Sequence, residues 1–314
     1  MNKSIRIGTR DSELALWQAK TVQKSLEKLG HVTELVPVKS LGDIQLEQPL
    51  YEMGITGIFT KTLDAALLSG NIDIAVHSMK DVPTSMPQGI VEAAVLKREN
   101  PTDLLLHKDL DFLSEKNETN PSIIATGSLR RKAQWLSKYP SHEVVNLRGN
   151  VNTRLQKLQD NPWQGAIFAA AGLNRIDLKP ENALELDWMI PAPAQGAMLV
   201  VTKEKDDFCR NVLAALNHKN SEICVHIERQ FLKTLEGGCT APIGALAEIE
   251  GETIHFKGGL FGLEGKEKYI EEISFPISQY KNAGRKAAKS ILGKGGKELM
   301  KEIKGKMNSG SSPK

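Results

Sequence analysis

The sequence has few cysteines and few aromatic residues, and each shortage excludes a class of protein. Cysteine occurs only at positions 209, 224 and 239, with neither a C-x-x-C pair nor the spacing of metal ligands. No disulfide framework and no metal site are therefore expected, and the pattern predicts a reduced, cytoplasmic setting. Aromatic residues make up 5% of the chain, and none forms a stacking platform beside the arginines of the kind that single-stranded nucleic acids require.

Long apolar runs and strong net charge are also missing. No stretch approaches the roughly 20 apolar residues of a membrane span, so no membrane partner is expected. The first eight residues lead directly into a predicted strand, without the apolar region of a signal peptide. The net charge of +3 argues against a general nucleic-acid-binding protein. The length of 314 residues suits about two or three globular domains.

Arginine is present but unevenly distributed. Five of the eleven arginines lie between residues 126 and 175, namely Arg130, Arg131, Arg148, Arg154 and Arg175. A guanidinium group holds carboxylates and phosphates through paired hydrogen bonds, which an ammonium group does not do. The cluster therefore indicates either an anion site or, equally well on its own, a solvated basic face.

The N-terminal part of the chain has an α/β pattern. A strand at residues 4–8, a helix that ends at Gly30 and a strand at 32–38 are typical of a parallel sheet. Asp11 or Ser12 is the expected N-cap, and the expected inward residues of this helix are Leu14, Trp17, Val22, Leu26 and Leu29. Residues 42–57 show no period and predict a mobile loop, before a helix at 59–68.

A buried strand is predicted at residues 72–76, directly before His77-Ser78-Met79-Lys80-Asp81-Val82-Pro83. Ligands of open α/β sheets gather at the carboxyl ends of strands. Lys80 and Asp81 are therefore candidate functional residues, although the two could also form a plain surface ion pair.

The polar stretch 97–103 predicts a crossing into a second α/β domain, in which strand ends repeatedly deliver an arginine. A strand at 123–126 leads into a helix capped by Ser128, whose first turn carries two arginines and whose free N–H groups suit an anion. Further strands at 144–147 and 166–171 precede Arg148 and Arg175. This regular placement favours an anion site over a solvated face.

A second crossing is predicted at residues 191–196, followed by a return strand at 197–201. From about residue 218 the pattern changes to a helix, three alternating stretches (243–249, 253–261 and 267–275) and a final helix. The predicted fold is α/β, with two doubly wound domains, a ligand cleft between them, and a C-terminal α+β domain with a three-stranded antiparallel sheet. The predicted domains are 1–97 with 197–216, 98–196 and 217–306, before a disordered tail at 307–314.

Cys239 lies on a loop that follows Gly237-Gly238, which ends a predicted helix, and precedes Pro242. A thiol on an accessible loop is a candidate nucleophile or point of covalent attachment. Taken alone, a small buried packing residue is the more common alternative.

Seven motifs lie in one order between residue 8 and about residue 244. They read Gly8-Thr9-Arg10-Asp11-Ser12-x-Leu14-Ala15-Leu16-Trp17-Gln18, His77-Ser78-Met79-Lys80-Asp81-Val82-Pro83, Gly127-Ser128-x-Arg130-Arg131, Leu147-Arg148-Gly149-Asn150-x-Asn152-Thr153-Arg154, Ala169-Ala170-Ala171-Gly172-Leu173-x-Arg175, Pro191-Ala192-Pro193-x-Gln195-Gly196 and Glu236-Gly237-Gly238-Cys239. Together they resemble the hydroxymethylbilane synthase (porphobilinogen deaminase) family.

The resemblance implies a monomeric transferase of tetrapyrrole and haem biosynthesis, with two domains like periplasmic binding proteins and a third that carries a cofactor. Such an enzyme joins four porphobilinogen molecules head to tail into hydroxymethylbilane and releases ammonia at each step. The product grows on a dipyrromethane primer held by a thioether to the cysteine that Cys239 matches. Each pyrrole carries an acetate and a propionate, which accounts for many arginines on a nearly neutral chain. No metal, nucleotide or nucleic acid is implied.

The resemblance also assigns roles to residues. Asp81 matches the catalytic aspartate, whose carboxylate can stabilise developing positive charge and shuttle protons. The implied cofactor-binding residues are Cys239, Lys80, Asp81, Thr126, Ser128, Arg130, Arg131, Arg148 and Ser78. The implied substrate-binding residues are Arg10, Ser12, Gln18, Arg148, Asn150, Arg154, Arg175, Gln195 and Phe59.

One segment departs from the family pattern. The mobile loop usually reads Gly-Lys-Gly followed by Phe-x-Lys-Glu, whereas residues 55–62 keep Phe59 and Lys61 but have threonine at positions 56 and 62. Two other classes remain as alternatives, an anion-binding sensor and a nucleic-acid binder. The third domain and the cysteine loop argue against the sensor, and the low net charge argues against the nucleic-acid binder.

Overall fold

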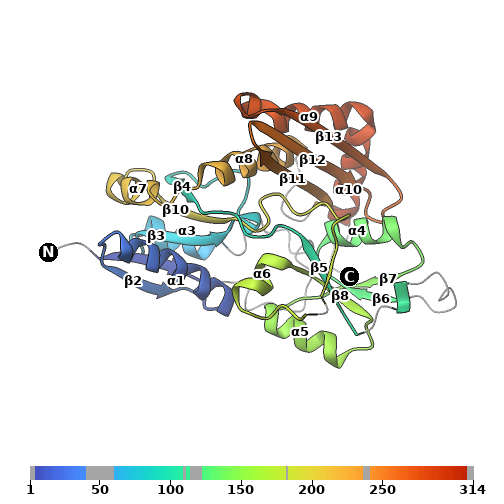
Figure 1. Cartoon of the computed structure of the whole chain (residues 1–314), viewed down its shortest axis with the longest axis horizontal. Coiled ribbons are helices and arrows are strands. Elements are labelled where there is room, and N and C mark those ends of the chain that lie inside the picture. Colours follow the sequence, from blue (N-terminus) through green and yellow to red (C-terminus); the bar gives the residue numbers. More distant parts are fainter. Residues whose placement is uncertain are drawn as a thin grey trace.

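The structure, a computed structural model, describes residues 4–39, 60–108, 111–113, 122–181, 183–235 and 241–309. Within these ranges the strands form two five-stranded sheets and one three-stranded sheet. Figure 1 shows the first sheet beside α1 and α3, the second beside α5 and α6, and the third packed beneath α9. No helix in the described ranges has both the length and the apolar character needed to cross a lipid bilayer.

The first sheet is mixed. Its strands, in order across the sheet, are β2 (Thr33–Pro37), β1 (Ile5–Thr9), β3 (Ile74–Ser78), β10 (Met198–Lys203) and β4 (Ile90–Val95). β1 pairs in parallel with β2 and β3, whereas β10 runs antiparallel to both of its neighbours. The helices of this region are α1 (Glu13–Lys28), α3 (Lys61–Leu68) and α7 (Asp207–Ala214). The predicted return strand is therefore confirmed as β10.

The second sheet repeats this plan. Its strands, in order, are β7 (Glu143–Val145), β6 (Ile123–Ala125), β8 (Gly165–Ala169), β5 (Asp103–His107) and β9 (Leu184–Glu185). β6 is parallel to β7 and β8, and β5 is antiparallel to its neighbours. The helices are α4 (Leu129–Lys138), α5 (Val151–Asp160) and α6 (Ala170–Arg175), with a short turn η2 (Asp111–Leu113). The antiparallel strand next to the central strand is β10 in the first sheet and β5 in the second. Each of these two strands directly follows a crossing between the sheets.

The C-terminal region packs helices against one face of an antiparallel sheet. Its elements are α8 (Lys219–Thr234), β11 (Ile243–Glu250), β12 (Thr253–Phe261), β13 (Lys268–Pro276), η3 (Ile277–Asn282), α9 (Ala283–Ile291), η4 (Leu292–Gly296) and α10 (Lys297–Ser309). Phe231 of α8 meets Phe256 of β12 edge to face in the buried core. The predicted fold class, two α/β domains and a C-terminal α+β domain, is confirmed.

The structure corrects the predicted inward face of α1. Trp17 and Leu29 are 38% and 49% exposed, and the residues of α1 that are buried are Ala15, Gln18, Ala19, Val22 and Leu26. These five lie on one stripe at helical spacing, which Trp17 does not share, whereas Leu29 is the C-cap beyond the last turn of α1. The small residues Ala15 and Ala19 form part of the stripe, so hydrophobicity alone points to the wrong large side chains.

Three predicted boundaries are also wrong. The strand expected at 166–171 ends at Ala169, because Ala170 already begins α6. The tail expected to be disordered from residue 307 is helical as far as Ser309, since α10 continues to that residue. The buried strand expected at 72–76 lies at 74–78 as β3, so Ser78 belongs to the strand. The predicted loop at 42–57 lies outside the described residues.

Candidate active site

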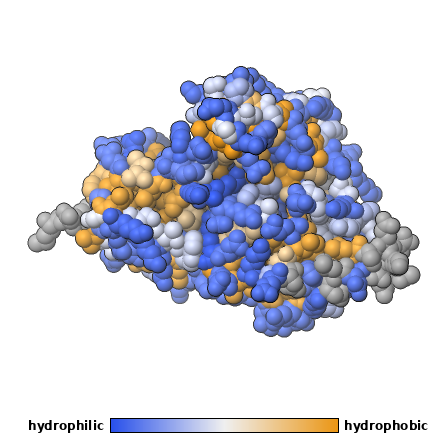
Figure 2. Space-filling view, viewed as in Figure 1, coloured by the Kyte–Doolittle hydropathy of each residue, from blue (hydrophilic) through white to orange (hydrophobic). Residues whose placement is uncertain are grey.

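A cavity of about 290 Å³ lies between the first two sheets. Figure 2 shows hydrophilic residues gathered at the centre of this face of the molecule. The predicted site residues that line the cavity are Arg10, Ser12, Ser78, Lys80, Asp81, Ser128, Arg130, Arg131, Arg148, Asn150, Arg154 and Gln195. The structure therefore brings together residues from motifs that are spread over most of the chain.

Strand ends supply most of this lining. Arg10 and Ser12 follow β1, and Ser78 is the last residue of β3. Ser128 follows β6 and caps α4, since its side chain accepts a hydrogen bond from Arg131 N at 3.4 Å. Because parallel strands present their carboxyl ends at one edge of each sheet, both sheets turn the same kind of edge towards the cavity.

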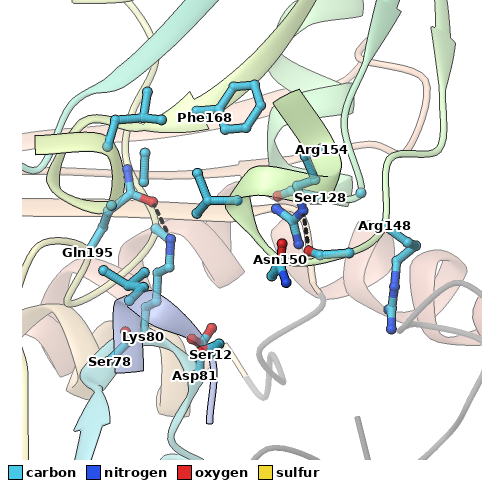
Figure 3. A pocket seen from close by; sticks show the side chains of 18 of the residues that line it. Ser12, Ser78, Lys80, Asp81, Ser128, Arg148, Asn150, Arg154, Phe168 and Gln195 are labelled. Carbon is cyan, nitrogen blue, oxygen red and sulfur yellow. Dashed lines mark hydrogen bonds between the residues drawn. The ribbon is translucent and has the colours of Figure 1, made fainter. Parts of the chain in front are cut away.

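Lys80 and Asp81 lie in a single turn, η1 (Met79–Asp81), directly after β3. The flanking residues Met79 and Val82 are buried in the core of the first sheet. The two buried side chains fix the turn at both ends, and the polar side chains of Lys80 and Asp81 between them face the cavity. Figure 3 shows both side chains on one side of the cavity, across from Arg154.

The two polar side chains of η1 have different surroundings. Lys80 Nζ donates a hydrogen bond to Gln195 Oε1 at 3.2 Å. Burial, followed by the positive charge of Arg131, lowers the pKa of Lys80 to about 8, so a ligand carboxylate would stabilise its charged form. Asp81 is half-buried, and its carboxylate has no hydrogen-bond or ion-pair partner among the described residues.

Asp103, the first residue of β5, holds several site residues in place, although its sequence context predicts only a crossing between domains. Its carboxylate accepts hydrogen bonds from Arg130 Nη1 at 2.7 Å, from Arg131 Nη2 at 2.8 Å and from Gln195 Nε2 at 2.9 Å. Burial alone would raise the pKa of Asp103, but the two guanidinium groups hold it well below its usual range. One carboxylate thus orients both arginines directly, and Lys80 through Gln195.

The only local signal for Asp103 is an acidic residue directly before the apolar run 104–106. Its partners Arg130 and Arg131 also donate to the backbone, to Ile190 O at 2.8 Å and to Ile167 O at 2.8 Å. The Nε of Arg130 is buried without a hydrogen-bond partner among the described residues. Arg130 and Arg131 bond directly to the buried carboxylate of Asp103, and Lys80 is linked to it through Gln195. Three positive charges thus accompany one buried negative charge, so this wall keeps a surplus of positive charge.

Two further arginines lie at the opposite end of the cavity, Arg148 on the loop before α5 (Val151–Asp160) and Arg154 on the first turn of that helix. Arg154 Nε donates to Gly149 O at 2.7 Å, and burial together with the charges of Arg131 and Arg148 lowers the pKa of Arg154 to about 10. Gly149 has φ +116°, and a Cβ there would lie 2.7 Å from Thr153 Cγ2. Glycine therefore permits the tight approach that places both arginines.

Three predicted site residues do not line the cavity, and each instead forms a hydrogen bond with a residue in or next to its walls. Gln18 Nε2 donates to Ser78 Oγ at 2.9 Å, and Thr126 Oγ1 accepts from Ser128 N at 3.3 Å. Arg175 Nη2 donates to Gly196 O at 2.6 Å in the second crossing.

Phe59 and Cys239 lie outside the described residues, as does most of the divergent segment 55–62. In the described parts of the chain, no group of three His, Cys, Asp or Glu side chains is placed to hold a metal ion.

This arrangement suits a ligand with several carboxylates. Donors converge from both walls, positive charge exceeds negative charge, and among the described residues one unpaired carboxylate lies beside these donors. A dipyrromethane has a carboxylate-bearing acetate and propionate on each ring, so the donor set and the unpartnered Nε of Arg130 fit such a group. The fold and the site define a protein of two α/β domains with a cation-rich cavity between them, which suits a polycarboxylate ligand and also holds an unpaired carboxylate.

Comparison with known proteins gives the family. Residues 5–227 match the family described as porphobilinogen deaminase, dipyromethane cofactor binding domain, and residues 222–293 match the porphobilinogen deaminase C-terminal domain. The porphobilinogen deaminase of Syntrophomonas wolfei is 38% identical over 96% of this chain and 99% of that protein. The one from Trichlorobacter lovleyi is 39% identical over 96% and 97%. The chain belongs to the porphobilinogen deaminase family.

Membership of this family makes the chain a transferase of tetrapyrrole biosynthesis with a dipyrromethane cofactor. The solved structure of a methionine-binding protein superposes with a TM-score of 0.45 at 16% identity, over 68% of this chain and 89% of that one.

Proposed function

We propose that the chain condenses four porphobilinogen molecules head to tail into hydroxymethylbilane, with one ammonia released per step, on a dipyrromethane primer joined to Cys239. The observation that carries this proposal is the cation-rich cavity in which, among the residues that the structure describes, one carboxylate is unpaired, that of Asp81. Each added pyrrole brings two carboxylates, so a growing product needs several cationic donors around one reacting centre. We further propose that the enzyme is a cytoplasmic monomer, with domain boundaries near residues 97, 196 and 216.

The resemblance to the family divides the donors into two groups. We propose that Lys80, Arg130 and Arg131, which Asp103 orients, hold the cofactor carboxylates together with Ser78, Ser128 and Arg148, and that Thr126 supports Ser128. Arg10, Ser12, Asn150, Arg154 and Gln195 then hold the substrate and the growing product, with Gln18 and Arg175 in supporting positions. Phe59, which lies outside the described residues, is proposed as a further substrate-binding residue. The bound cofactor supplies the terminal pyrrole carbon to which the first substrate is added.

The carboxylate of Asp81 acts on the substrate. Loss of ammonia from the aminomethyl group of porphobilinogen leaves an electron-poor azafulvene, whose developing positive charge a nearby carboxylate stabilises. The free α-carbon of the terminal pyrrole attacks the azafulvene to form the new carbon–carbon bond. That α-carbon must then lose its proton, which the same carboxylate can take up. The absence of an ion-pair partner among the described residues leaves Asp81 available for both tasks.

The other two cysteines support the assignment of the thioether to Cys239. Cys209 and Cys224 are 1% and 7% exposed in the folded chain. Burial, followed by the negative charge of Glu228, raises the pKa of Cys224 to about 12, which suppresses the thiolate needed for attachment. The two buried thiols are thus poorly suited to attachment, which supports Cys239 as the proposed attachment point.

The proposal is tested by the stoichiometry of the reaction. Purified protein incubated with porphobilinogen is expected to consume four molecules and to release four of ammonia for each hydroxymethylbilane formed. Product is identified by its conversion to uroporphyrin I and by mass spectrometry. Binding of porphobilinogen without release of ammonia would favour the anion-binding sensor and contradict the proposed activity.

Arg154→Ala is expected to weaken binding of the substrate during elongation without unfolding the protein. A hydrogen bond to a charged group contributes about 1.5–3 kcal/mol, so we expect a loss of affinity of about 10- to 100-fold. The measurement is KM for porphobilinogen, together with the distribution of partly elongated species by intact mass. The matched control is Arg210→Ala on α7, where the arginine is exposed and pairs only with neighbouring residues. An unchanged KM and an unchanged distribution in Arg154→Ala would count against this assignment.

A further inference from the structure

Arg229 lies on α8 in the C-terminal region, yet its guanidinium group reaches the turn that carries Lys80 and Asp81. Nη1 donates to Val82 O at 3.0 Å and to Met79 O at 3.4 Å, and Nη2 donates to Pro83 O at 2.7 Å. Nη2 also lies 3.4 Å from a carboxylate oxygen of Glu92 on β4. Arg229 is 9% exposed, so these contacts are largely shielded from water.

The same face of α8 holds the turn by apolar packing. Val225 is one helical turn before Arg229 and belongs to the buried cluster that contains Met79 and Val82. The turn therefore interacts with α8 in two ways. Its buried residues share a hydrophobic cluster with Val225, and carbonyl oxygens in and directly after it accept hydrogen bonds from Arg229. The only residues of the turn left to face the cavity are Lys80 and Asp81.

We infer that Arg229 is a positioning residue for the reaction, which sets the orientation of the Asp81 carboxylate through the backbone of residues 79–83. The inference rests on the proposed role of Asp81. η1 is only three residues long, so its carbonyl groups are held chiefly by contacts outside the turn. Displacing a reacting group by about 1 Å can cost about 100-fold in rate. Arg229 does not line the cavity between the first two sheets, so the inferred role is distinct from carboxylate binding.

α8 thereby connects the two reacting parts of the enzyme. The helix ends at Thr234, five residues before Cys239 in the sequence. α8 is thus close in sequence to the proposed attachment point. The same helix is hydrogen-bonded to the turn that carries the proposed catalytic carboxylate. A guanidinium group suits this task because its planar fork reaches several carbonyl oxygens at once, which an ammonium group cannot match.

The first test compares kcat and KM of the primed holoenzyme. Arg229→Ala is expected to lower kcat by about 10- to 100-fold, because the carboxylate is misplaced, while KM for porphobilinogen changes little. Arg229→Lys is expected to fall between this variant and the wild type. The matched control is Lys233→Ala, one turn further along α8, where the side chain is exposed and does not contact the turn. Intact mass confirms the cofactor in each variant, and circular dichroism confirms folding.

A second test separates positioning from a general loss of stability. A cavity of about 750 Å³ lies beside Arg229, lined in part by Met79, Glu92 and Gln230, so a small cation can reach the space that the substitution vacates. Millimolar guanidinium chloride is expected to restore kcat of Arg229→Ala several-fold, whereas sodium chloride at the same ionic strength is not. Arg229→Ala with a wild-type kcat would overturn the inference, as would a loss that guanidinium leaves unchanged.

A double-mutant cycle with Asp81→Asn identifies the group through which Arg229 acts. If Arg229 acts through Asp81, the double variant is expected to be little slower than Asp81→Asn alone. Fully additive losses would overturn the inference. A fully active Asp81→Asn would instead contradict the proposed function, so the two failures are distinguishable.

Discussion

Replacing Asp81 with asparagine is expected to give a folded, primed protein that has lost about 10²- to 10⁴-fold in the rate of elongation. This corresponds to about 3–5 kcal/mol of activation free energy. Asparagine has nearly the same shape, and the buried neighbours Met79 and Val82 hold η1 at both ends, so the turn keeps its conformation. The amide carries no negative charge and cannot take up a proton, so the two proposed actions of the carboxylate are lost.

The measurement is single-turnover kinetics on primed Asp81→Asn protein, with the cofactor verified by intact mass and the fold by circular dichroism. The matched control is Asp207→Asn on α7, where the carboxylate is 84% exposed and pairs with Arg210. The control is expected to behave as the wild type. A primed, folded Asp81→Asn protein that works within a few-fold of the wild type would show that this carboxylate is not the acid–base group.

Replacing Cys239 with alanine is expected to abolish turnover, because no primer can be attached and elongation has no covalent starting point. A thiolate is the side-chain group suited to forming a stable thioether, and alanine removes it without adding bulk or charge. Intact mass should show the wild-type chain with a dipyrromethane adduct and the Cys239→Ala chain at its unmodified mass.

The other cysteines provide the controls for this prediction. Cys209→Ala and Cys224→Ala each remove a buried thiol from a core cluster, so both variants should keep the adduct and the activity. A normal adduct in Cys239→Ala protein, or its loss only in Cys224→Ala protein, would place the attachment elsewhere.

Much of the fold could be predicted from local sequence patterns. The alternating stretches of the C-terminal region correspond to β11, β12 and β13, because a half-buried strand repeats every two residues. Gly30 has φ +85° directly after α1, as expected of a glycine that ends a helix. The misplaced boundary at Ala170 has a physical reason, since a short apolar run of alanines fits a buried strand and a buried helix equally well.

Local patterns and the family motifs together located most of the polar and charged residues that line the cavity. Lys80, Ser128 and Arg148 each follow a predicted strand, and strand ends of α/β sheets meet at one edge. The sequence by itself therefore determined the family motifs, the anionic character of the ligand and the position of the candidate carboxylate, because all three depend on neighbours along the chain.

The tertiary structure alone decided how the candidate residues are held. Asp103 pairs with arginines 27 and 28 residues away, and Arg229 bonds to the carbonyl of Val82 across 147 residues. Hydrogen bonds between such distant groups leave no periodicity in either segment. Sequence patterns assign the arginines only to a ligand. In the folded chain, Arg130 and Arg131 also bind the buried carboxylate of Asp103. Which charges face the ligand and which hold the site together depends on the packing of β5 and α8 against elements remote in sequence.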